Sequence, residues 1–517
     1  MYKWTTYCLL FAFILILSAI VNSLLWVFLF DSVIPSKGKV WPKPKHIIPH
    51  DVIYQVRGRN PEIIAIGHNC ILLDKVIARV THDLDILNGF DIPKVDKSEK
   101  YKRIAKLNVL LTEPCEEYPY LGMDESYELT ISTSSKLQAT SIWGIIRGLE
   151  TFVQLFYSEN KNVFIRGETI VDYPNYEHRG LLLDTGRLFV PVYNLLMILD
   201  GMAMNKLNVF HWHICDNIYC PIKSEIFPNM SSNAQNLYTK DDVKFIVNYA
   251  RERGIRVIPE FDVPGHQTAL QKVFPSLFLH CNNEESAELM NPTLPETYNF
   301  LQRLLGELNT WFPDDHIHLG GDEAHPECWN NHNETLKYMK ENNMSVVDLQ
   351  TMFYQKLVEQ LKPGMKQIVW QDVFDYGINM STHDNIVQVW NYNPQSEMVK
   401  LLEAGYQILY SSFWYLNFEP KTYDFGNYYT QDPRSAIESS TSNDLLQNIK
   451  GGEACMWTNF ITDHTVLLDW IFPKTCATAE VLWSFTNGSK INYEGWSRIY
   501  EQTSRMTKRG VPTKRPG

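Results

Sequence analysis

The sequence of 517 residues has no excess of positive charge. It contains 47 Lys and Arg against 59 Asp and Glu, which gives a formal net charge of −12. Binding to nucleic acid phosphates requires a basic face, so this balance argues against nucleic acid as a partner. The sequence also lacks a Cys-x-x-Cys pair, internal repeats and low-complexity tracts. A zinc ribbon, a redox dithiol and a solenoid are therefore not indicated.

Long apolar runs are scarce, and the one at the amino terminus covers residues 7–30. A membrane-spanning helix needs about 20 apolar residues, whereas the apolar core of a signal peptide usually has 7–15. We therefore expect an uncleaved signal anchor with a cytoplasmic amino terminus. Cleavage after Ser23 is the alternative, although it would leave an apolar segment on the mature protein. In both cases the body of the protein enters the secretory pathway. It is then anchored in the Golgi or at the cell surface, or it is secreted or lysosomal.

The remaining cysteines and the glycosylation sequons agree with translocation. An oxidising compartment favours disulfides, and we predict the pairs Cys70–Cys115 and Cys281–Cys328. Pairing of Cys215 with Cys220 is left open. Each Asn-x-Ser/Thr sequon is weak evidence by itself. The predicted glycosylation sites are Asn229, Asn333, Asn343, Asn379 and Asn487.

Two folded domains follow a predicted linker at residues 31–45. Residues 46–173 mix apolar strands, such as 63–66 and 108–111, with a helix at 141–150 whose apolar residues have helical spacing. This pattern predicts a small α/β domain without evident chemistry.

Residues 174–517 have a different texture, in which short apolar runs alternate with helical stretches. Each of the apolar runs ends in a polar or aromatic cluster, as at Asp184, Glu260 and Trp370. Eight such units predict a (β/α)₈ barrel, whose active site lies where the strands end. The predicted strands are 180–183, 207–213, 255–260, 317–320, 367–370, 386–390, 407–410 and 452–456.

The fourth predicted strand ends in Gly320-Gly321-Asp322-Glu323. Two glycines allow a tight turn that presents both carboxylates to the barrel mouth. An exposed acidic turn is the structural alternative, but it does not explain the position at a strand end. A retaining glycosidase with two catalytic carboxyls holds them about 5 Å apart on either side of the sugar. Adjacent residues do not easily straddle a ring, so we infer that Glu323 alone acts on the glycosidic oxygen. Asp322 would then orient a nucleophile that belongs to the substrate.

The chain resembles the β-hexosaminidases of glycoside hydrolase family 20, and its pattern is close to that of the animal lysosomal enzymes. The resemblance covers almost everything after the apolar run. It is carried by the motifs Trp41-Pro42, Trp143-Gly144, His178-Arg179-Gly180, His211-Trp212-His213-Ile214, Pro259-Glu260-Phe261-Asp262-Val263-Pro264-Gly265-His266, His318 to Glu323, Gly451 to Trp457 and Glu480 to Ser484.

The resemblance implies an exo-β-N-acetylhexosaminidase that removes terminal GlcNAc or GalNAc with retention. Glu323 would be the acid and base, and Asp322 would steer the substrate's acetamido group into an oxazolinium intermediate. Tyr415 would hold the acetamido carbonyl oxygen. Trp370, Trp390 and Trp457 would wall its methyl group, because aromatic side chains are rigid and exclude water.

The resemblance also assigns the ring hydroxyls of the sugar to Arg179, with Asp184 in the same substrate-binding set. An ion pair between these two residues is the structural alternative. His266 and Asp216 would form a relay behind Glu323, which changes its protonation state twice in each turnover. His211 and His213 alternate on one strand but have no third ligand at a matching spacing, so we expect neither zinc nor another cofactor.

Some positions depart from the family pattern. Members usually carry Gly-Glu after the last-strand tryptophan, and that Glu binds sugar hydroxyls; here Thr458 and Asn459 follow. Asn417 matches the subunit type that accepts charged sugars, but Phe418 replaces the arginine beside it. These departures keep an alternative open, a glycan-binding member with weak hydrolysis. A membrane-tethered adhesion protein is a third hypothesis, and it does not explain the functional strand ends.

The expected partner is a glycan: the end of an N-glycan, a glycolipid or a chitooligosaccharide. Family members are often dimers, so a homodimer is a further expectation.

Overall fold

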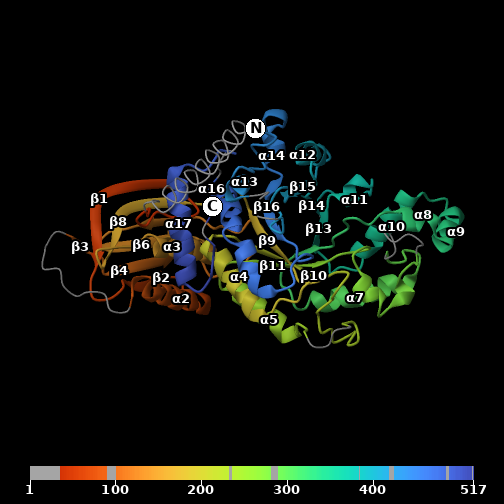
Figure 1. Cartoon of the computed structure of the whole chain (residues 1–517), viewed down its shortest axis with the longest axis horizontal. Coiled ribbons are helices and arrows are strands. Elements are labelled where there is room, and N and C mark those ends of the chain that lie inside the picture. Colours follow the sequence, from red (N-terminus) through yellow and green to blue (C-terminus); the bar gives the residue numbers. More distant parts are fainter. Residues whose placement is uncertain are drawn as a thin grey trace, which may run out of the picture.

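The computed structural model describes residues 35–89, 101–231, 236–280, 289–383, 385–418, 424–484, 488–514 and 516. Within these ranges no helix is both long and apolar enough to cross a membrane. The apolar run at residues 7–30, predicted to be an anchor, lies outside the described residues. Figure 1 shows two bodies along the long axis, a sheet domain from the first third of the chain and the barrel from the rest.

The amino-terminal domain is a mixed sheet covered by two helices. The strand order is β2-β4-β6-β5-β8-β1-β3, and β7 pairs with β8. Burial alternates along β4 and β6, so one face of the sheet packs against the helices and the other is open. The elements are β1 (His46–Val56), β2 (Glu62–Gly67), α2 (Ile71–Asn88), β3 (Lys102–Arg103), β4 (Lys106–Leu111), β5 (Tyr127–Thr130), β6 (Ser134–Ala139), α3 (Ile142–Gln154), β7 (Tyr157–Glu159) and β8 (Asn162–Asp172).

The second body is a closed barrel of eight parallel strands, as the sequence predicted. Each strand pairs with its neighbour in sequence, and the last pairs with the first. Nearly all strand residues are buried, because side chains fill the inside and helices cover the outside. The strands are β9 (His178–Asp184), β10 (Val209–Cys215), β11 (Arg256–Phe261), β12 (His316–His318), β13 (Lys366–Trp370), β14 (Asn385–Val389), β15 (Gln407–Tyr410) and β16 (Ile449–Met456).

Helices follow the strands and carry their own start signals. The helix α5 begins at a capping box of Thr239 and Asp242, and α10 begins at one of Ser345 and Asp348. The longer helices are α4 (Val192–Met204), α5 (Lys240–Arg251), α7 (Pro295–Leu308), α9 (Asn333–Glu341), α10 (Val346–Val358), α12 (Pro394–Glu403), α16 (Lys474–Ser484) and α17 (Tyr493–Lys508). The shorter ones are α6 (Thr268–Gln271), α8 (Glu327–Asn331), α11 (Asp372–Asp375), α13 (Phe425–Tyr429), α14 (Asn443–Leu446) and α15 (Leu467–Ile471), with 3₁₀ turns at Pro275–Leu277, Glu438–Ser440 and His464–Val466.

Buried ion pairs and hydrogen bonds join the two bodies. The Arg147 guanidinium on α3 donates to the backbone oxygens of Arg253 and Gly254 at 3.0 and 2.7 Å. Lys206, which follows α4, lies 2.9 Å from Asp172 at the end of β8. Because these buried polar groups are paired across the boundary, the sheet domain is a fixed support for the barrel.

The segment predicted as a linker is partly packed. Trp41 is fully buried, and its indole N–H donates to the Cys476 backbone oxygen at 3.0 Å. Val40 is also buried. The predicted linker at residues 31–45 is therefore packed against the folded body at Val40 and Trp41. The Pro, Gly and Lys residues of this segment indicated a linker in the sequence, and the buried side chain of Trp41 was not recognised.

One predicted disulfide and one pair that the sequence left open are present among the described residues. Cys70 is bonded to Cys115, and Cys215 to Cys220, which decides the pairing left open by the sequence. Cys328 is disulfide-bonded as well; its predicted partner Cys281 lies outside the described residues. Four predicted glycosylation sites, Asn229, Asn333, Asn343 and Asn379, are exposed. Asn487 lies outside the described part of the chain.

Candidate active site

The turn after β12 sets the two candidate carboxylates. Gly320 and Gly321 have φ values of 65° and 96°. A Cβ on Gly320 would overlap the Asp262 carboxylate, which accepts a hydrogen bond from the Gly321 N–H at 2.7 Å. Glycine is therefore required by both backbone conformation and space. The turn leaves the Asp322 side chain 16% exposed and that of Glu323 57% exposed.

Glu323 itself has a left-handed backbone, with φ of 52°. A glutamate rarely adopts this conformation, and such strain is found mostly at functional sites. Its backbone N–H donates to Asp372 Oδ1 at 3.2 Å. The adjacent carboxylates are thus held in a defined turn, unlike a freely exposed acidic loop.

His266 lies beside both carboxylates. Its Nε2 is 3.4 Å from Glu323 Oε2 and 3.7 Å from Asp322 Oδ2, and its Nδ1 is 3.7 Å from Asp216 Oδ1. Burial alone would lower the pKa of His266, but Asp322, Asp216 and Glu323 outweigh it and raise the pKa well above its usual value. In turn, the hydrogen bond to His266 and the charge of His266 lower the pKa of Glu323, against a smaller effect of burial. The predicted group of His266, Asp216, Asp322 and Glu323 is therefore brought together.

Asp216 is fixed from two sides. Its Oδ2 lies 2.9 Å from His213 Nε2 and 2.8 Å from a guanidinium nitrogen of Arg187. Burial would raise the pKa of Asp216, but hydrogen bonds with His213 and His266 lower it well below its usual value. Asp216 is therefore an anion in the working pH range and supports a cation at His266.

The four aromatic residues predicted to contact the acetamido group form an apolar box at the ends of β13 to β16. Ring centroids of Trp370 and Trp457 lie 5.9 Å apart, those of Tyr415 and Trp457 6.3 Å, and those of Trp390 and Tyr415 6.2 Å. Trp370 and Trp457 are buried, and Trp390 and Tyr415 are half-buried. Such a box suits a small methyl group and excludes water from it.

Asp372 is a site residue that the sequence reasoning missed. It begins α11, two residues after Trp370, and its Oδ2 accepts a hydrogen bond from the Trp390 indole N–H at 2.8 Å. Its Oδ1 holds the Glu323 backbone. Burial, assisted by the charge of Asp322, raises the pKa of Asp372 to about 6. Its position just after a barrel strand was the available signal.

Arg179 lies away from the site, which corrects a prediction. It is the second residue of β9, so it belongs to the amino-terminal end of the barrel. The guanidinium is fully buried and donates to the backbone oxygens of Lys206 and Tyr176 and to Glu125 at 2.6 Å. The alternative of an ion pair with Asp184 is also wrong, because the partner of Arg179 is Glu125.

Arg187, three residues after the end of β9, is at the mouth instead. Its guanidinium lies 3.2 Å from Asp184 Oδ2 and 5.3 Å from the centre of the Trp457 ring. The side chain is 17% exposed. Asp184, predicted in the substrate-binding set, is fully buried and also accepts hydrogen bonds from the Thr458 N–H and hydroxyl at 3.0 Å. Asp184 thus orients both Arg187 and Thr458.

The residues that depart from the family pattern lie in the loops after β15 and β16. The Asn417 side-chain amide donates to the Asn459 amide oxygen at 3.5 Å, which links the loops after β15 and β16. Asn459 is exposed and Asn417 is half-buried. Phe418 is 38% exposed, and its ring lies 6.0 Å from that of Tyr415. This edge of the site is neutral and partly apolar.

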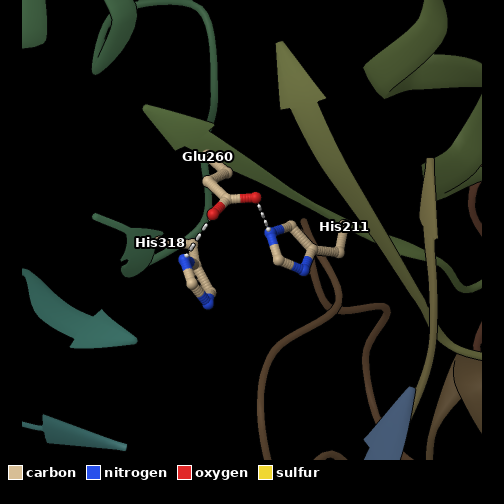
Figure 2. A group of neighbouring side chains, drawn as sticks. All are labelled: His211, Glu260 and His318. Atoms are coloured by element: carbon tan, nitrogen blue, oxygen red, sulfur yellow. Dashed lines mark ion pairs between the residues drawn. The ribbon is translucent and has the colours of Figure 1, made fainter. Parts of the chain in front are cut away.

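Below the mouth, histidines and carboxylates fill the barrel. Figure 2 shows Glu260 between His211 and His318, with distances of 3.0 Å to His211 Nε2 and 3.1 Å to His318 Nδ1. These three residues are close enough to hold a cation, a grouping that sequence spacing did not reveal. However, Glu260 also accepts a hydrogen bond from Trp370 and pairs with His213, so charged and polar neighbours already account for its carboxylate. Two other such groups in the described chain are Asp262, His266 and Asp322, and Asp314, Asp315 and His316.

Comparisons with known proteins agree with this geometry. The family model described as the catalytic domain of glycosyl hydrolase family 20 matches residues 176–486, and one described as "beta-acetyl hexosaminidase like" matches residues 40–155. The chain is 36% identical to the beta-hexosaminidase subunit beta of Felis catus over 472 residues, 86% of each chain. It is 34% identical to the subunit alpha of Bos taurus over 499 residues, 91% of this chain and 93% of that one.

A solved structure shares both bodies. The chitobiase of Flavobacterium johnsoniae superposes with a TM-score of 0.81 at 27% identity, covering 92% of this chain and 73% of that one. A beta-hexosaminidase of Streptomyces plicatus superposes with a TM-score of 0.72 at 22% identity, a likeness of fold.

Proposed function

We propose a role for each residue at the barrel mouth from one premise: the chain belongs to glycoside hydrolase family 20 and is an exo-acting β-N-acetylhexosaminidase. The observation that carries the proposal is the aromatic box of Trp370, Trp390, Trp457 and Tyr415 beside the adjacent carboxylates Asp322 and Glu323. A pocket of this shape accepts the acetamido group and brings its oxygen to the anomeric carbon.

In the first half of the reaction, Glu323 gives its proton to the glycosidic oxygen as the bond from this oxygen to C1 breaks. The acetamido carbonyl oxygen forms a new bond to C1, which yields an oxazolinium ion. Asp322 accepts the acetamido N–H and stabilises the positive charge that develops there. Tyr415 donates its hydroxyl to the carbonyl oxygen and keeps it in line. Burial raises the pKa of Tyr415 well above its usual value, so the hydroxyl stays a donor.

In the second half, the Glu323 carboxylate takes a proton from water as the water oxygen attacks C1. The C1–O bond of the oxazolinium breaks, and the acetamido group is restored. Two inversions at C1 give net retention, with only one protein carboxyl on the glycosidic oxygen.

Arg187 replaces Arg179 in the proposed recognition of the sugar's ring hydroxyls. Its charge faces the box from β9, diametrically opposite β13, and Asp184 and Asp216 hold it in place. Asn417 and Asn459 offer neutral hydrogen bonds from the loops after β15 and β16. The terminal sugar is therefore bound between Arg187 and the aromatic box.

We propose that residues 7–30 anchor the enzyme and that the body works in the secretory pathway on the ends of glycans. Two disulfides and four exposed sequons among the described residues support exposure to an oxidising, glycosylating compartment. The homodimer also stays a prediction, and sedimentation of the purified full chain tests it.

The test of the function is hydrolysis of p-nitrophenyl β-GlcNAc and β-GalNAc between about pH 4 and pH 7, where carboxylates and histidines titrate. A thiazoline that mimics the oxazoline is added as an inhibitor. We expect turnover of both sugars and strong inhibition. A folded protein that turns over neither sugar would contradict the proposal and favour the glycan-binding alternative, with Asn459 as the first residue to examine.

A further inference from the structure

Glu260 lies at the centre of the polar network inside the barrel. It is the fifth residue of β11 and is fully buried. Oε1 accepts a hydrogen bond from the Trp370 indole N–H at 2.9 Å and lies 3.1 Å from His318 Nδ1. Oε2 lies 2.5 Å from His213 Nδ1 and 3.0 Å from His211 Nε2. One carboxylate thus contacts side chains from β10, β12 and β13. Figure 2 shows two of these contacts, those with His211 and His318.

Two of these contacts lead directly to the reaction site. Trp370 is a wall of the acetamido box, and its indole N–H donates to Glu260. His213 lies 2.9 Å from Asp216, and Asp216 is next to His266, which faces Glu323. Glu260 therefore directly contacts Trp370, which belongs to the box that positions the nucleophile. It is four contacts from Glu323, the group that transfers the proton, through His213, Asp216 and His266.

The negative charge of Glu260 matters more than its volume. His213 has one ring nitrogen toward Glu260 and the other toward Asp216, so both nitrogens must carry a proton to satisfy two carboxylates. A neutral His213 would turn a lone pair toward one of them. The two carboxylates raise the pKa of His213 well above its usual value in spite of burial. The other charged or titratable groups around this pair are His211 and His318, with Glu453, Asp262 and Arg187 beyond them.

We propose that Glu260 is a positioning residue for both halves of the reaction, which fixes Trp370 in the acetamido box and His213 on Asp216 at the same time. Substrate never touches it. This inference rests on the proposed function, because Glu260 would position the same aromatic box and, through His213, the same acid Glu323. It also explains why a buried anion lies at this point inside the barrel, among one indole N–H and three imidazole rings from β10, β12 and β13.

The test uses Glu260→Gln in the full chain, with Glu125→Gln as its matched control. Glu125 is equally buried and pairs with two cations, Arg147 and Arg179, but it lies at the opposite end of the barrel. Both variants lose one buried charge, so both should lower the thermal unfolding temperature. Only Glu260→Gln should also lower kcat/KM and weaken thiazoline binding, each by about 10- to 100-fold, as expected for residues that support reactive groups.

A purely structural Glu260 gives a different pattern. Folded Glu260→Gln with wild-type kcat/KM and wild-type thiazoline affinity would overturn the proposal, and so would equal losses in both variants. If Glu260→Gln does not fold, imidazole ¹⁵N spectra of the wild type decide instead. We expect His213 to stay protonated on both nitrogens at pH 7, and a neutral His213 at that pH rejects the inference. A wild type that neither hydrolyses GlcNAc nor binds thiazoline contradicts the proposed function, while the spectra still test the Glu260–His213 pair.

Discussion

The Nε2 atom of His266 lies 3.4 Å from Glu323 Oε2, close enough for the charge of one to control the protonation of the other. His266 is held as a cation by Asp216 and Asp322, and it lowers the pKa of Glu323. The acid that must give a proton to the leaving group thus faces a positive charge. This relationship makes activity sensitive to pH.

The first prediction concerns that pH dependence. kcat/KM should fall as pH rises through the pKa of Glu323, because only the protonated carboxyl can act as the acid. His266→Gln removes the cation that lowers this pKa, so the pKa rises and the alkaline limb moves to higher pH. The maximum rate should also drop, since Glu323 loses a partner that positions it. Profiles of kcat/KM for wild type and variant check this, and a limb that stays in place or moves to lower pH contradicts it.

Replacement of the acid should depend on the leaving group. Glu323→Gln should fold normally, because the side chain is exposed and holds no other element together. Its kcat/KM for p-nitrophenyl β-GlcNAc should fall by about 100- to 10,000-fold, the usual contribution of an acid or base. The loss should be smaller for a dinitrophenyl glycoside, whose leaving group needs little protonation. Equal losses for both substrates would show that Glu323 is not the acid.

The hydroxyl of Tyr415 should act mainly on kcat. Tyr415→Phe keeps the ring in the aromatic box but removes the donor to the acetamido oxygen, and kcat should fall by about 100- to 1000-fold. KM should change little. Tyr410→Phe is the matched control, since Tyr410 ends β15 five residues before Tyr415 and its hydroxyl lies 3.5 Å from Gln431. Comparable losses in the two variants would place the effect in folding.

The neutral edge of Asn417, Phe418 and Asn459 should give no advantage to charged sugars. Phe418 contributes no positive charge where the family's arginine stands in the subunit type that accepts them. A 6-sulfated arylglycoside should therefore be cleaved no faster than the unsulfated one. Phe418→Arg should raise the relative rate of the sulfated substrate, because a guanidinium pairs well with an oxyanion. Faster cleavage of the sulfated substrate by the wild type is the contrary outcome.

The barrel could be predicted because its signal is local and repeated. Eight apolar runs end in reactive or aromatic side chains, and parallel strands bring those ends to one face. The same rule shows why Arg179 was misplaced. It stands at the start of β9 and therefore at the wrong end of the barrel, whereas Arg187 follows the end of that strand. The family motif favoured Arg179, whereas the direction of β9 places Arg187 at the barrel mouth.

Contacts between distant strands were beyond the sequence. Asp372 was missed because its partners, Trp390 and the Glu323 backbone, come from different loops. The role of Glu260 is visible only when β10, β11, β12 and β13 are assembled around it. Trp41 was placed in a linker because its burial depends on α16, more than 400 residues later. Such long-range packing has no periodic signature along the chain.

The central claim is that the acetamido oxygen of the substrate is the nucleophile and that Asp322 steers it. The most direct test compares p-nitrophenyl β-glucosaminides with N-acetyl, N-fluoroacetyl, N-difluoroacetyl and N-trifluoroacetyl groups, with Asp322→Asn alongside the wild type. Fluorine withdraws electrons from the carbonyl oxygen, so we predict that wild-type kcat falls steeply along the series and that Asp322→Asn is slow with the N-acetyl substrate. A kcat that is independent of fluorination, or an Asp322→Asn variant with wild-type kinetics, would contradict substrate-assisted catalysis and require a nucleophile from the protein.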